Sequence, residues 1–222
     1  MVPVENKFYT TVFDNPHFII VDKKAMVLSV PGRLGDEDDR PVLGRILEAD
    51  LGITMLPVHR LDYEVQGLIM FAKTAEAHRA GNAWFEKKEV FKTYSALTTL
   101  LKDAPKEDFP IESELTWKSK LLRGKKRAYQ SPHGKDSLTL AKLRGVSGDV
   151  FHWELNPITG RSHQLRFELF RHNHPIIGDE LYSSDRAFTE SGIALRAFKI
   201  DFSNAANALK FSLPKIIEIP TF

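Results

Sequence analysis

Runs of hydrophobic and polar residues divide the chain into short segments of predicted secondary structure. Apolar or alternating runs predict strands at residues 18–24, 67–73, 90–100, 149–158, 194–202 and 208–214. Helical spacing of apolar residues predicts helices at residues 40–51, 74–89 and 160–173, with Thr74 as an N-cap. Because these elements do not alternate as regular βαβ units, we expect an α+β fold with a mixed, mostly antiparallel sheet.

Composition indicates an ordinary soluble globular protein. The chain has 222 residues, of which 42% are hydrophobic and 27% charged, and it contains no cysteine. Disulfides, thiolate chemistry and Cys-based zinc sites are therefore excluded. The first residues lack the pattern of a signal peptide, and no apolar run approaches the roughly 20 residues that span a bilayer. We expect a cytoplasmic protein that does not enter a membrane.

One segment, residues 117–135, is rich in positive charge although the net charge is only +2. Its basic residues are Lys118, Lys120, Arg123, Lys125, Lys126, Arg127 and Lys135, with no acid before Asp136. Such a segment suits contact with the phosphate backbone of a nucleic acid. It is equally typical of a solvated basic loop, and composition does not decide between these interpretations.

Several common chemistries lack their motifs. The chain has no dinucleotide-binding glycine pattern, no phosphate-binding P-loop and no Gly-x-Ser-x-Gly nucleophile elbow. His172 and His174 are too few to indicate a metal site and favour surface or packing roles.

Three groups of residues remain as candidates for chemistry: Asp62 with Arg60, Tyr94 with Lys92, and the run at 159–166. Each has a structural explanation when taken singly, since Asp62 could cap a turn and Arg166, within that run, could pair with a surface acid.

Taken together, however, the motifs resemble a known family. The blocks "HRLD", "FKTYSAL", "PITGRSHQLR" and "HPIIGDELY" occur in this order, and "DNPHFIIVDKKAMVLSVPGR" and "GKDSLTLAKL" add to them. The combination resembles the RluA-like pseudouridine synthases, from about residue 12 to the end. "LSVPGR" and "PITGRSHQLR" are similar to the branch that modifies short structured loops in tRNA and 23S rRNA.

The resemblance implies a fold and an activity. We expect residues 1–222 to form one catalytic domain, with flanking helices and a cleft across its central sheet, and no added S4 RNA-binding domain. The expected reaction isomerises specific uridines of rRNA or tRNA to pseudouridine after flipping the base out, at a cost of a few kcal/mol. It involves no net redox change, so we expect neither a cofactor nor a metal. Nothing demands more than a monomer.

The same resemblance implies roles for individual residues. Asp62 is the expected catalytic carboxylate, Arg166 would keep it ionised and oriented, and Tyr94 would pack on the base and relay a proton. Arg60 would fill the space that the flipped base leaves. Further expected substrate-binding residues are His59, Leu61, Lys92, Arg161, His163 and Leu165, and the expected RNA-binding patch is Lys118, Lys120, Arg123, Lys125, Lys126 and Arg127.

Some positions depart from the family pattern. The chain has Val65-Gln66 in place of Thr-Ser, Lys24-Ala25-Met26 in place of Pro-x-Gly, and Glu168 and Arg196 where histidine is common. An alternative hypothesis is therefore an RNA-binding or RNA-folding factor with little or no catalysis. A weaker alternative is a carboxylate-dependent glycosidase, which would need a second catalytic acid.

Overall fold

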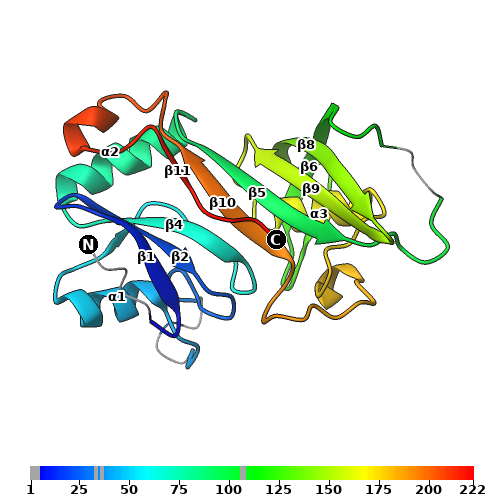
Figure 1. The fold of residues 1–222 in the computed structure, drawn as a ribbon, viewed down its shortest axis with the longest axis horizontal. Coiled ribbons are helices and arrows are strands. Elements are labelled where there is room, and N and C mark those ends of the chain that lie inside the picture. The colour runs from blue at the N-terminus through cyan, green and yellow to red at the C-terminus, as the bar shows by residue number, and fades with distance from the viewer. Residues whose placement is uncertain (1–5, 33–34, 36–37, 106–108) are drawn as a thin grey trace. The chain divides into compact units, whose positions relative to one another are not determined.

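The computed structural model describes residues 6–32, 35, 38–105 and 109–222 (Figure 1). The chain divides into two compact units, which we treat separately. Unit 1 comprises Met1–Phe91 and Ala197–Pro220, and unit 2 comprises Lys92–Arg196 and Thr221–Phe222. No helix among the described residues is long and apolar enough to cross a membrane.

Unit 1 contains a sheet packed against helices. Its strands are β1 (Tyr9–Asp14), β2 (Phe18–Lys23), β3 (Leu56–Pro57), β4 (Gln66–Ala72), β10 (Leu195–Asp201) and β11 (Ile216–Glu218). The strand order is β1-β2-β4-β10, with β3 paired to β4 and β11 to β10. The helices are α1 (Leu43–Leu51), α2 (Ala75–Glu86) and the short 3₁₀ helix η3 (Ala208–Phe211).

The core of unit 1 forms where β2 and β4 pack against α2 and the segment containing η3. Phe18, Trp84 and Phe211 form an aromatic cluster with ring centroids 5.6–5.7 Å apart. The indole N–H of Trp84 donates to the Ala206 carbonyl at 2.7 Å, so this buried polar group is satisfied. β4 is buried along its whole length and therefore forms a rigid support for the loop that precedes it.

The second residue of β4, Gly67, occupies a position that requires glycine. Its φ is +116°, and a Cβ at this position would lie 2.3 Å from the Ala197 carbonyl oxygen. Because the neighbouring atoms are backbone, they cannot move aside cheaply. The glycine therefore lets the start of β4 lie close against the chain at Ala197.

Unit 2 contains a run of antiparallel strands with a helix on one face. Its strands are β5 (Phe91–Thr98), β6 (Glu114–Arg123), β7 (Ala128–Gln130), β8 (Lys135–Ser147) and β9 (Val150–Pro157), in the order β5-β9-β8-β6-β7. Every pairing along this order is antiparallel. The helix α3 (Gln164–Arg171) and the 3₁₀ helix η2 (Glu180–Tyr182) follow β9. Trp117 of β6 stacks on His172, at the end of α3, with centroids 4.4 Å apart.

The structure confirms the α+β class, since the described residues form a mainly antiparallel sheet and three α-helices. It also confirms the N-cap, since the Thr74 hydroxyl accepts from the Ala77 amide at 3.2 Å. The predicted strands at 18–24, 67–73, 90–100, 149–158 and 194–202 correspond to β2, β4, β5, β9 and β10. The prediction of one catalytic domain over residues 1–222 stays a prediction.

One segment and one boundary were predicted wrongly. The strand expected at 208–214 is instead η3, flanked by Asn207 and Ser212 in the left-handed conformation, and the final strand is β11. The helix expected from residue 160 begins at Gln164, because His163 is left-handed (φ 53°) and cannot continue a helix backward. The basic segment 117–135, for which a solvated loop and a phosphate contact were both open, is largely strand, since β6 and β7 occupy much of it.

Candidate active site

The candidate catalytic carboxylate, Asp62, lies in the loop between β3 and β4 of unit 1. Its side chain is half-buried, Leu61 before it is buried, and Arg60 is exposed. The Val65 amide donates to the Asp62 carbonyl at 3.2 Å and closes a turn just before β4. Apolar Leu61 therefore anchors the loop while its polar neighbours remain accessible to a substrate.

Ser29 holds the backbone directly before Asp62. Its hydroxyl donates to the Leu61 carbonyl and accepts from the Leu61 amide, both at 2.9 Å. One buried hydroxyl thus satisfies both backbone groups of a single residue, which leaves that residue little freedom to move. Ser29 belongs to the "LSVPGR" block, in which no individual residue had been assigned a role.

A second set of contacts holds the backbone directly after Asp62. The Tyr63 carbonyl accepts from the Met26 amide at 2.8 Å and from the Lys23 ammonium at 3.4 Å. Lys23 also donates to the carbonyls of Val27 (2.9 Å) and Lys24 (3.0 Å). The segment 23–29 therefore clamps the candidate catalytic loop on both sides of Asp62, a preorganisation that a catalytic group requires.

Lys23 is unusual because its side chain is fully buried. Burial lowers its pKa from 10.5 to about 7, and the negative charges of Asp62, Glu64 and Asp22 oppose that shift. The ammonium is stabilised by three carbonyl dipoles and by nearby carboxylates, so its partners are all acceptors or anions. Lys23 thus holds the backbone beside Asp62, and with a pKa of about 7 it is only partly charged at neutral pH.

The departures from the family pattern leave this clamp intact. Met26 adopts φ 61°, the left-handed conformation that glycine adopts most easily, and its amide still reaches Tyr63. Val65 is 2% exposed and Gln66 is 6% exposed, so both are built into the start of β4. The altered side chains therefore change what surrounds the loop more than how it is held.

His59 occupies a structural position at the base of the same loop. Its Nε2 accepts from the Met70 amide of β4 at 3.0 Å, and its ring lies 4.8 Å from that of Phe85 in α2. These contacts attach the loop to both β4 and α2. Of the predicted substrate-binding residues in this loop, the exposed Arg60 is the one best placed to meet RNA.

In unit 2, Arg166 is held by a buried ion pair. Its guanidinium donates from Nε and Nη2 to the two carboxylate oxygens of Asp179, each at 2.7 Å, and it lies 5.4 Å from the Tyr182 ring centroid. Arg166 and Asp179 are 2% and 1% exposed. A two-pronged pair in a buried position fixes the plane of the guanidinium, so Arg166 can act as a rigidly oriented cation.

Gly178 enables Asp179 to reach that position. Its φ is +87°, and a Cβ there would lie 2.8 Å from Phe188 and 2.9 Å from the Gly192 carbonyl. Asp179 itself falls in the "HPIIGDELY" block, but nothing in the sequence linked it to Arg166. An acid in one matched motif and an arginine in another were the available signal.

Tyr94 and Lys92 lie on β5, on the face of the unit 2 sheet that α3 covers. Tyr94 pairs in register with Leu155, and Leu155 with Ala141, on the face to which Thr139 also points. Tyr94 is 6% exposed, and the Lys92 ammonium lies 5.8 Å above its ring. The structure thus places the tyrosine on the same side of unit 2 as Leu165 and Arg166 of α3.

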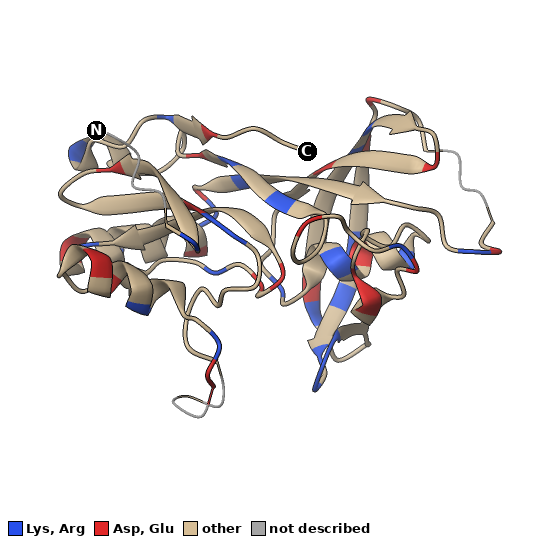
Figure 2. Ribbon diagram, turned by 60° about the horizontal axis from the view of Figure 1, so that its bottom comes forward, with Lys and Arg blue, Asp and Glu red and all other residues tan. Residues whose placement is uncertain are grey.

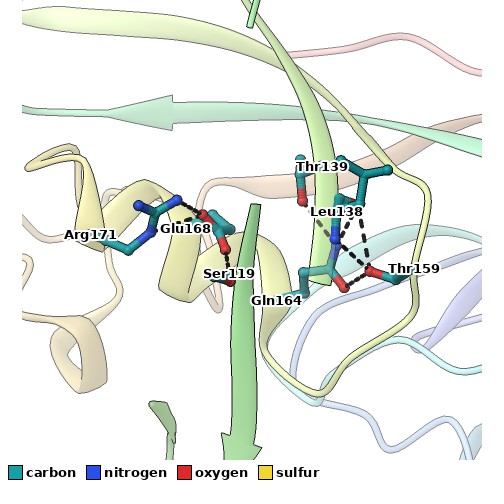
Figure 3. A network of polar contacts seen from close by, with 7 residues as sticks. All are labelled: Ser119, Leu138, Thr139, Thr159, Gln164, Glu168 and Arg171. Atoms are coloured by element: carbon teal, nitrogen blue, oxygen red, sulfur yellow. Dashed lines mark hydrogen bonds and ion pairs between the residues drawn. The ribbon is translucent and has the colours of Figure 1, made fainter. Parts of the chain in front are cut away.

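The loop before α3 is tied to β8 through Gln164 (Figure 3). The amide nitrogen of Gln164 donates to the Leu138 carbonyl (3.0 Å) and the Thr139 hydroxyl (2.9 Å), while its oxygen accepts from Thr159 (2.8 Å) and the Arg161 amide (3.0 Å). All hydrogen-bonding positions of the buried amide are used. This network fixes the "TGRSH" loop at the start of α3.

Arg161 and His163, two predicted substrate-binding residues, have defined structural partners in that loop. The Arg161 guanidinium donates to the Asp136 carbonyl at 2.8 Å. The His163 Nδ1 lies 3.3 Å from the Tyr182 hydroxyl, which also accepts from the Ala128 amide at 2.8 Å. Both side chains therefore connect the loop to neighbouring elements, whatever contact they make with a substrate.

Glu168, one departure from the family pattern, has a structural role. It is fully buried on α3, accepts a hydrogen bond from Ser119 of β6, and pairs with Arg171 at 2.5 Å (Figure 3). A buried carboxylate needs such partners. The Ser119 hydrogen bond attaches α3 to β6, and the Arg171 pair lies within α3.

The predicted RNA-binding patch does not form a single face. Along β6, Lys118 and Lys120 project from one side of the sheet, opposite Leu138 and Asp136, whereas Arg123 projects to the other side and donates to Ser162. Lys125, Lys126 and Arg127 are exposed at the turn between β6 and β7. Acidic residues lie among the basic ones (Figure 2). Arg123 reaches the loop before α3 through Ser162.

Comparisons with known proteins agree with this picture. A family model described as RNA pseudouridylate synthase matches residues 17–172. Dual-specificity RNA pseudouridine synthase RluA of Vibrio vulnificus is 32% identical over 209 residues, covering 90% of this chain and 80% of the relative. RluA of Pasteurella multocida is 32% identical over 218 residues, covering 96% and 95%.

Solved structures give the same fold. Human RNA Pseudouridylate Synthase Domain Containing 1 superposes with a TM-score of 0.71 at 23% identity, covering 100% of this chain and 86% of that one. The fold is that of a pseudouridylate synthase domain. The chain belongs to the RNA pseudouridylate synthase family, a family of isomerases, and within it to the RluA-like enzymes. The resemblance first seen in "HRLD" and "PITGRSHQLR" is thereby confirmed.

Proposed function

We propose that this enzyme isomerises specific uridines in tRNA or 23S rRNA to pseudouridine, with Asp62 as the carboxylate that starts glycosidic cleavage. The reaction exchanges the N1–C1′ bond for a C5–C1′ bond and needs no cofactor. The observation that carries the proposal is the clamp on the Asp62 loop. Ser29 holds Leu61 and the segment from Lys23 to Met26 holds Tyr63, so Asp62 is fixed from both sides.

Arg166 and Tyr94 are the proposed partners of Asp62 in the reaction. The Arg166 guanidinium, oriented by Asp179, supplies a fixed positive charge that favours an ionised, correctly aimed carboxylate. Tyr94 supplies an apolar ring for the uracil and a hydroxyl for proton transfer. Since these residues belong to both units, we infer that residues 1–222 act together as one catalytic domain.

Arg60 is the proposed residue for base flipping. A uridine within a folded RNA must leave its stack before it can react. Arg60 is exposed two residues before Asp62, and a guanidinium can stack on the bases left behind and contact phosphate. The exposed turn Lys125–Arg127 extends the proposed RNA footprint. We place this activity in the cytoplasm, in a monomer.

The test is Asp62→Asn, assayed by tritium release from tRNA and 23S rRNA labelled at uracil C5, because forming the C5–C1′ bond displaces that hydrogen. We expect at least about a ten-thousand-fold fall in rate, as for removal of a member of a catalytic unit, with RNA binding retained. Glu64→Gln is the matched control, since it removes a charge from the same loop, and it should keep its activity.

Other outcomes would identify other functions. Unchanged tritium release by the Asp62→Asn enzyme would remove Asp62 from the mechanism. RNA binding without pseudouridine formation by the unmodified protein would favour the RNA-folding factor. Release of free uracil would favour the glycosidase.

A further inference from the structure

Met26 combines backbone strain with an exposed apolar side chain. Its φ of 61° lies in the left-handed region, which residues other than glycine, asparagine and aspartate rarely adopt. Its side chain is 42% exposed, so much of this apolar group faces solvent. The Met26 amide bond to Tyr63 is a backbone contact, and a glycine would make it equally well.

The position of Met26 indicates what its exposed side chain can contact. The 24–27 turn contacts the backbone of Tyr63, the residue after Asp62, and the exposed Arg60 belongs to the same loop. The Met26 side chain therefore lies at the surface beside the candidate active-site loop. Residues other than glycine that are held in sparsely populated backbone conformations cluster at active sites and ligand clamps.

We propose that Met26 contacts a nucleobase of the RNA substrate, next to the uridine that is modified, and so contributes to substrate selection. This inference rests on the proposed function. A thioether is flexible and polarizable and makes favourable contacts with aromatic rings. Methionine is also among the apolar side chains that proteins insert against base steps.

The proposal requires stability and RNA recognition to change in opposite directions. Met26→Gly relieves the strain and removes the side chain, Met26→Ala keeps the strain and removes the side chain, and Met26→Leu keeps an apolar side chain of similar size. We expect Met26→Gly to melt about 1–3 °C above Met26→Ala. Both should raise the KM for tRNA or 23S rRNA by roughly two- to twelve-fold, as loss of a sulfur–aromatic contact would, with kcat little changed.

Matched controls separate the two effects. Ser212 is exposed, uncharged and left-handed (φ 52°) in the same unit, so Ser212→Gly should relieve strain without changing KM. Leu209 is 79% exposed, so Leu209→Ala truncates an exposed apolar side chain elsewhere in unit 1 and should also leave KM unchanged. Met26→Leu should retain a KM within about two-fold of the unmodified enzyme.

The measurements are tritium release at varied RNA concentration and filter binding with the Asp62→Asn background. If the unmodified enzyme releases tritium and Met26→Ala keeps its KM, the inference is wrong while the proposed function stands. A KM that rises equally in Leu209→Ala would also overturn the inference. If the unmodified protein neither binds RNA nor releases tritium, the proposed function fails, and the inference fails with it.

Discussion

Lys23 should make the stability of the enzyme depend on pH in a way that Lys23→Met abolishes. Burial lowers the pKa of Lys23 from 10.5 to about 7, against the opposing effect of Asp62, Glu64 and Asp22. In the unfolded chain the ammonium keeps its proton up to about pH 10. Between pH 7 and 10 the unfolded state therefore binds more protons than the folded state, and the free energy of unfolding rises with pH.

The size of the effect follows from the two pKa values. Each pH unit in which the folded lysine is neutral and the unfolded lysine charged contributes about 1.4 kcal/mol. From pH 7 to pH 9 the folded form goes from half to almost fully deprotonated, which gives about 2 kcal/mol over this interval. Above pH 10.5 Lys23 is neutral in both states, so the free energy of unfolding carries no penalty for burying its charge. The penalty grows as the pH falls and is at its full size once the pH has fallen through the folded pKa of about 7.

Urea denaturation of the unmodified enzyme and of Lys23→Met at pH 7 and pH 9 measures this difference. We call the gap the unfolding free energy of the unmodified enzyme minus that of Lys23→Met. From pH 7 to pH 9 this gap should increase by about 2 kcal/mol, equivalent to about 4–8 °C in Tm. Taking the gap cancels the titration of all other groups. A gap that moves by less than about 0.5 kcal/mol would refute the argument, because Lys23 would then remain charged in the folded state.

Two further substitutions test the clamp and the buried ion pair. Ser29→Ala removes the hydroxyl that binds both backbone groups of Leu61, so we expect the free energy of unfolding, measured by urea denaturation, to fall by about 1–3 kcal/mol. Because the Asp62 loop is then held less firmly, kcat should fall more than KM rises. Asp179→Asn leaves the charge of Arg166 without its buried counter-ion, so the free energy of unfolding, measured by thermal melting, should fall by about 3–5 kcal/mol. The exposed Asp185→Asn is its control and should stay within about 0.5 kcal/mol.

Sequence patterns predicted the strands whose apolar character is continuous, such as β2 and β4, because both are buried along their whole length. They missed β6, although Trp117 and Leu121 alternate with Lys118 and Lys120 there. Ser119 interrupts the apolar series, and it faces inward because it donates to a buried carboxylate on α3. A polar contact made across the fold cannot be seen in local periodicity.

The start of α3 illustrates the same limit. The predicted helix opens at Gly160, but the Gln164 side-chain amide donates hydrogen bonds to Leu138 and Thr139 of β8. Its oxygen accepts from Thr159 and the Arg161 amide, which holds the preceding residues as a loop. The motif residues were identified because the family pattern marks them. Their supports were not, since Ser29 contacts a residue 32 positions away and Asp179 one 13 positions away.

The departures from the family pattern at Lys24-Ala25-Met26 change side chains on the turn beside the Asp62 loop without changing how the loop is held. The bonds that hold Tyr63 come from the Met26 amide and the Lys23 ammonium, and neither the change at Lys24 nor that at Met26 removes them. The altered positions instead place new side chains on the turn beside the Asp62 loop, of which that of Met26 is exposed. Loop geometry and surface chemistry are therefore controlled by different atoms of one short segment. Such an arrangement allows the RNA preference to change while the carboxylate remains fixed.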